Sequence, residues 1–105
     1  MSYFVAYLTD AERPVDGDQI ASGKGWLAWI DWVIERHEDY PCAAHLAEEG
    51  WVEPAEAIET LEAELAEMAK AAPGDLKHIT RALLTEVQDR PESTSGIVVT
   101  DGTAE

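Results

Sequence analysis

The sequence is poor in three features, and each shortage excludes a class of protein. It has one cysteine, Cys42, so no disulfide can form within the chain. It has seven lysines and arginines against 22 aspartates and glutamates, a formal net charge of −15. Direct nucleic-acid binding is therefore not expected, because binding phosphates needs a basic surface. It also lacks an apolar run of about 18 residues and an apolar leader after Met1, so we expect no membrane role and a cytoplasmic location.

Motifs that specify a reaction or a cofactor are also missing. The chain has no HExxH, no CxxC pair and no repeated Glu-x-x-His, so no metal site is predicted. Residues 17–24 differ from a phosphate-binding loop in two ways. Five residues separate Gly17 from Gly23-Lys24, where the loop has four, and Gly25 stands where the loop requires Ser or Thr. No nucleophile signature surrounds Ser22 or Cys42. We therefore favour a protein that is not an enzyme and that uses no cofactor.

Tryptophan, by contrast, is plentiful, and three of the four tryptophans fall within residues 26–32. The apolar positions around them recur at the spacing of one helical face: Trp26, Ile30, Val33 and His37. This spacing predicts a helix over about 23–37 with Ser22 as its N-cap. The turn from Ser22 to Gly25 could hold an anion or could serve only as a cap. Because the helix is apolar nearly all round, we expect it to be covered on more than one side.

The rest of the chain predicts an α+β protein that is mostly helical. Three further helices are expected over about 41–49, 54–72 and 75–89, and apolar, β-branched runs predict strands at 3–8 and 97–100. An unpaired strand would leave backbone groups unsatisfied, so we expect these N-terminal and C-terminal strands to pair into a small sheet on which about four helices pack. The third and fourth helices should be antiparallel neighbours, because their connection is short.

These elements are expected to form a single small domain over 1–105. It has a polar loop at 10–25, where Asp16-Gly17 could turn a hairpin into a short extended piece near 19–21, and a C-terminal linker plus strand at 90–100. Both faces of the first strand are predicted to be buried. The predicted core is Phe4, Val5, Leu8, Trp26, Ile30, Val33, Leu46, Ile58, Leu61, Leu65, Ile79, Leu83, Val87 and Val98.

Two groups of residues are candidates for a functional site. One is a ligand pocket with tryptophan walls and polar groups from a histidine and a tyrosine: Trp26, Trp29, His37, Tyr40 and Trp51. The other is an acidic, partner-binding face on the third helix: Glu53, Glu56, Glu59, Glu62, Glu64 and Glu67. A structural histidine and a merely solvated acidic face are the competing interpretations.

Acidity and aromatic excess without a catalytic motif favour a small protein that binds another protein. A specific version is an immunity-protein-like or antitoxin-like inhibitor of a basic partner, and a homodimer formed through surplus tryptophan surface is a further form of the same hypothesis. The alternative is a small-molecule or metal-binding protein that uses the tryptophan-lined pocket near His37.

Overall fold

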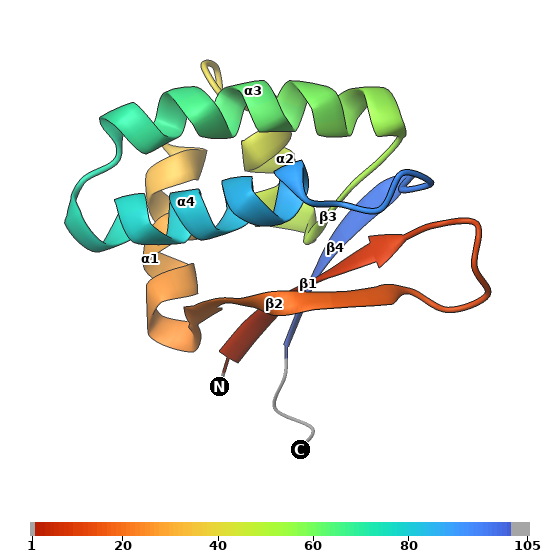
Figure 1. The fold of residues 1–105 in the computed structure, drawn as a ribbon. Helices are drawn as coiled ribbons and strands as arrows, with labels where there is room; N and C mark the ends of the chain where they lie inside the picture. Colours follow the sequence, from red (N-terminus) through yellow and green to blue (C-terminus); the bar gives the residue numbers. More distant parts are fainter. Residues whose placement is uncertain (1, 102–105) are drawn as a thin grey trace.

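Four strands and four helices make up residues 2–101, the part of the chain that the computed structural model describes (Figure 1). In chain order they are β1 (Ser2–Leu8), β2 (Val15–Ser22), α1 (Gly23–Ile34), α2 (Pro41–Glu49), β3 (Trp51–Val52), α3 (Ala55–Ala71), α4 (Gly74–Gln88) and β4 (Gly96–Asp101). The predicted fold class, mostly helical α+β, is confirmed.

The strands form one antiparallel sheet in the order β2-β1-β4-β3. At its centre β1 and β4 pair from Tyr3 with Asp101 to Leu8 with Gly96, so the predicted pairing of the N-terminal and C-terminal strands is confirmed. The two-residue strand β3 was not predicted, since so short a segment shows no alternation. It pairs with β4 and forms one edge of the sheet.

The second strand corrects the prediction for residues 10–25. An eight-residue strand over Val15–Ser22 occupies half of the segment expected to be a polar loop. It contains the short extended piece expected near 19–21, but Asp16 and Gly17 lie within the strand instead of turning the hairpin. Pairing with β1 determines this structure, although the strand itself is mostly exposed and polar. Gly17 permits the close packing, because a Cβ there would lie 3.0 Å from the Val5 carbonyl oxygen.

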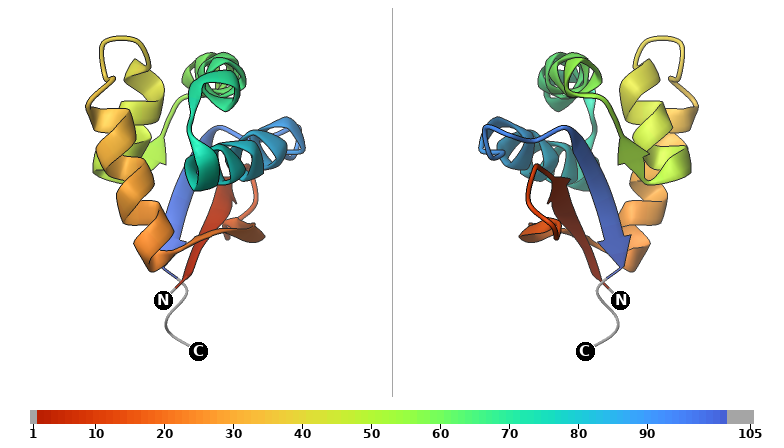
Figure 2. Two further views of the ribbon diagram at one scale, coloured as in Figure 1. Left: turned by 90° about the vertical axis from the view of Figure 1, so that its left-hand side faces the viewer. Right: turned by 90° about the vertical axis from the view of Figure 1, so that its right-hand side faces the viewer.

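The helices cover one face of the sheet. In the right-hand view of Figure 2, β1 and β4 lie in front of α1. The side chains that β1 and β4 direct into the core include Val5, Tyr7 and Ile97. The other face carries Phe4, Leu8 and Val98, which are only half-buried and do not belong to the core cluster. The expectation that both faces of β1 are buried was therefore wrong for Phe4 and Leu8.

The helical core follows the predicted stripes, with two corrections in α1. The N-cap is confirmed, since the Gly25 amide donates to the Ser22 hydroxyl oxygen over 3.1 Å. The helix ends at Ile34, three residues before the predicted end, because the amides of Arg36 and His37 bond carbonyls only three residues back. Ile30, predicted to be buried, is half-buried.

The other helices agree with the prediction. Helices α3 and α4 lie side by side and run in opposite directions (Figure 1). The α3 stripe is fully buried at Ile58, Leu61, Leu65 and Met68. Within residues 2–101 no helix is both long and apolar enough to cross a membrane.

Candidate functional site

Two of the tryptophans that were candidates for a pocket wall lie inside the core. Trp26 is 4% exposed and Trp29 is fully buried, and their rings stack with centroids 4.9 Å apart. Tyr3 of β1 stacks on the outer side of Trp26. The Trp29 indole Nε1 donates to the Thr80 hydroxyl oxygen over 3.0 Å, which satisfies its polar atom without a ligand. These rings join α1 to the sheet and to α4.

The remaining residues of the predicted pocket lie in other environments. His37 is exposed in the turn after α1, with its Nδ1 atom 3.0 Å from the Ile34 carbonyl oxygen. Tyr40 stacks on Trp32, and Trp51 lies in edge strand β3, where its ring meets that of His45. The five residues are thus divided among the core, a surface turn and a sheet edge.

Glu64, one of the six acidic residues predicted to bind a partner, is a buried helix cap. Its side chain is 8% exposed and accepts hydrogen bonds from the backbone amides of Cys42 over 3.2 Å and of Ala43 over 2.9 Å. Helix α2 begins at Pro41 after Tyr40, which provides no side-chain cap. The carboxylate of α3 therefore performs the capping function for α2. The prediction that Glu64 belongs to an exposed acidic face was wrong.

The other five acidic residues form a face that is only partly neutralised. In the described part of the chain, two ion pairs occur within 4.0 Å: Arg90 with Glu62 at 2.9 Å, and Lys70 with Glu67 at 3.9 Å. Glu53, Glu56 and Glu59 are exposed and have no such cation. These three carboxylates, one just before α3 and two in its first turns, form the acidic part of the site.

Beside Glu53 lies an apolar surface that we term the open sheet face: Phe4, Leu8, Val98 and Trp51, which surround the buried Ala6. Paired residues of antiparallel strands share a face, and here Val98 pairs with both Ala6 and Trp51. Trp51 is 40% exposed, which is unusual for so large an apolar side chain.

Acidic residues border the open sheet face on two sides. Asp16 of β2 pairs with Ala6 and so belongs to the same face. Glu53 lies against β4, because a Cβ on Gly96 would be 2.9 Å from the Glu53 Cγ atom. The face therefore has an apolar centre and an acidic rim.

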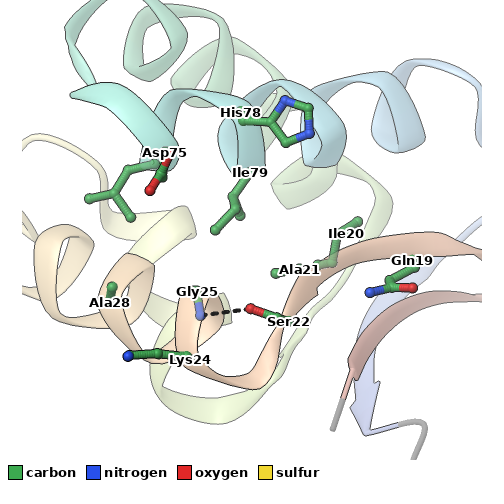
Figure 3. Close-up of a pocket in the computed structure, with 11 residues that line it drawn as sticks. Gln19, Ile20, Ala21, Ser22, Lys24, Gly25, Ala28, Asp75, His78 and Ile79 are labelled. Atoms are coloured by element: carbon green, nitrogen blue, oxygen red, sulfur yellow. Dashed lines mark hydrogen bonds between the residues drawn. The ribbon is translucent and has the colours of Figure 1, made fainter.

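A separate groove of about 690 Å³ lies between β2 and the beginnings of α1 and α4 (Figure 3). Its apolar lining includes Ile20 and Ala21 from β2 and Ile79 from α4. Its charged and polar groups include Lys24, Asp75 and His78. The Ser22 hydroxyl oxygen, which also lines the groove, already accepts a hydrogen bond from the Gly25 amide, as the dashed line in Figure 3 marks. This volume is typical of a small-molecule site.

Two side chains with potentially reactive groups, Cys42 and Tyr7, have raised pKa values. Burial, followed by the charge of Glu64, raises the pKa of the Cys42 thiol, which disfavours the nucleophilic thiolate. Burial, followed by Glu86, raises the pKa of Tyr7, whose hydroxyl donates to the Glu86 carboxylate over 2.7 Å. Between residues 2 and 101, no group of three or more His, Cys, Asp or Glu side chains is placed to hold a metal ion.

Comparison of the chain with protein-family models, with curated proteins and with solved structures gave no match. Function must therefore be argued from the surfaces themselves. Sequence reasoning missed the open sheet face because it treated β1 as buried on both sides. On β4, Val98 and Thr100 alternate with Ile97 and Val99, but this run is too short to show which face of the strand the helices leave uncovered.

Proposed function

We propose that this protein is a non-enzymatic interaction module that binds a basic protein. The observation that supports the proposal is the group of exposed carboxylates without a nearby cation, Glu53, Glu56 and Glu59, in a chain of net charge −15. Maintaining many like charges on one domain is unfavourable for its stability, whereas a basic partner would neutralise them. The inhibitor of a basic protein, like an immunity protein or antitoxin, is the specific form of this proposal.

Charge complementarity acts chiefly on the rate of association. An electrostatically steered pair associates up to a few hundred times faster at low salt than a neutral pair, and this advantage falls as ionic strength rises. At about 0.15 M salt the screening length is about 8 Å, so only carboxylates near the interface keep their effect. Exposed carboxylates of α3 should therefore influence binding more than carboxylates on a distant loop.

The test begins with capture of partners from an extract of the organism that encodes the protein, at about 50 mM salt. Proteins released by high salt are identified by mass spectrometry and purified, and their association rates are measured at increasing salt concentration. We expect a basic partner whose association with the Glu56→Lys/Glu59→Lys variant is about tenfold slower. The matched control, Asp10→Lys/Glu12→Lys, makes the same change in net charge on the exposed loop before β2.

The proposal is wrong if the extract yields no partner that salt releases, or if the association rate does not change with salt. It is also wrong if the loop variant slows association as much as the α3 variant, since net charge alone would then account for the effect.

One observation favours a second function, the binding of a small amphipathic anion in the groove of about 690 Å³ beside Lys24. We use 1-anilinonaphthalene-8-sulfonate as the probe, because its sulfonate matches Lys24 and its rings match the apolar lining. Ala28→Trp should fill the groove and abolish the increase in probe fluorescence, whereas Trp51→Ala should leave it unchanged. Equal probe fluorescence in the wild type and in Ala28→Trp would exclude this site.

A further inference from the structure

We infer that the basic partner docks on the open sheet face, with Trp51 as the anchor at its β3 edge and with Asp16 and Glu53 at the rim. This inference rests on the proposed function and names the surface that performs it. The partner that fits is a protein with a flat apolar centre and lysines or arginines around it.

The arrangement of the strands supports this choice of surface. Val5, Tyr7 and Ile97 point from β1 and β4 into the core, so alternation directs Phe4, Leu8 and Val98 to the opposite side. Those three side chains are half-buried and lie outside the core cluster. Adjacent apolar side chains on a face without a packed helix are a common feature of protein interfaces.

Trp51 has the features of an interface anchor. It lies at the sheet edge beside Val98 and contacts the His45 ring edge-on with centroids 4.6 Å apart, so its orientation is already restricted before binding. At 40% exposure it retains a large apolar area that a partner could cover. Partly exposed tryptophans that become buried on binding often contribute most of the binding energy.

The charges around the face decide between two possible occupants. A second copy of this chain would bring its own Asp16 and Glu53 to the rim, where like charges would repel across the interface. A partner with a basic rim would instead form attractive pairs at the same positions. The structure therefore favours a different, basic protein over self-association.

The experiment uses the partner released by salt in the test above and separates dissociation from association. Truncation of a buried anchor acts mainly on the dissociation rate, whereas loss of a rim charge acts mainly on the association rate. We expect Trp51→Ala to accelerate dissociation roughly 30-fold. Asp16→Asn should slow association and reduce its dependence on salt.

Two controls address stability and specificity. Leu27→Ala removes an apolar side chain that is 61% exposed on α1, away from the sheet, and should change neither rate. Val98→Ser tests the same face without removing a tryptophan and should also accelerate dissociation. Urea midpoints of all variants show whether each one is folded.

The outcomes separate this inference from the function on which it rests. If Trp51→Ala and Val98→Ser bind like the wild type while Glu56→Lys/Glu59→Lys binds slowly, the partner uses another face and only the docking inference fails. If ultracentrifugation shows a dimer that Trp51→Ala dissociates, the occupant is a second copy and the inference is wrong. If no basic partner is found, the proposed function fails with it.

Discussion

Replacement of Glu64 by alanine should strongly destabilise the protein without any partner present. The carboxylate accepts two backbone hydrogen bonds, from Cys42 and Ala43, at the otherwise uncapped beginning of α2. A hydrogen bond to a charged group contributes about 1.5–3 kcal/mol, and loss of a helix cap costs about 0.5–2 kcal/mol. Because these contributions overlap, we expect Glu64→Ala to cost about 2–4 kcal/mol, a large part of the stability of a small domain.

The measurement is urea unfolding followed by tryptophan fluorescence. Glu64→Gln retains one acceptor and should cost about 1–2 kcal/mol. The control is Glu67→Ala, on the same helix, whose side chain is 69% exposed and lies 3.9 Å from Lys70. Its effect should stay within about 0.5 kcal/mol. Equal midpoints for Glu64→Ala and Glu67→Ala would show that the cap contributes nothing and that Glu64 belongs with the surface carboxylates after all.

The remaining predictions concern buried aromatic residues. Trp29→Ala should lower the free energy of unfolding by about 3–5 kcal/mol, because it leaves a cavity and removes the hydrogen bond to Thr80; an unchanged urea midpoint would contradict the buried stack. Tyr7→Phe should cost about 1–2 kcal/mol at neutral pH, since the hydroxyl donates to Glu86. The folded-state pKa of Tyr7 lies above its usual 10.0, so this stabilisation is complete below pH 10 and is lost as the pH rises further. The difference between wild type and Tyr7→Phe should therefore narrow above pH 10 in unfolding measurements, and a constant difference would refute the linkage.

The sequence by itself determined the elements whose own residues carry a periodic pattern. Helical spacing located α1, α3 and α4 to within a few residues, and short β-branched runs located β1 and β4. The need to satisfy the backbone of a terminal strand was enough to predict that β1 and β4 pair. In these cases the pattern of buried and exposed residues repeats along one element. It can be recognised without knowing which other elements pack against that element.

Only the tertiary structure decided which side chains meet across long distances in the chain. Glu64 resembles its acidic neighbours in sequence, yet its contact with the amide of Ala43, 21 residues away, makes it a cap. The strand β2 exists because β1 pairs with it, although its own residues are typical of a loop. Trp29 is buried because α4 and the sheet pack against it, whereas Trp51 stays partly exposed at the sheet edge. Periodicity indicates that a residue prefers burial, but whether another element covers it depends on how the whole chain packs.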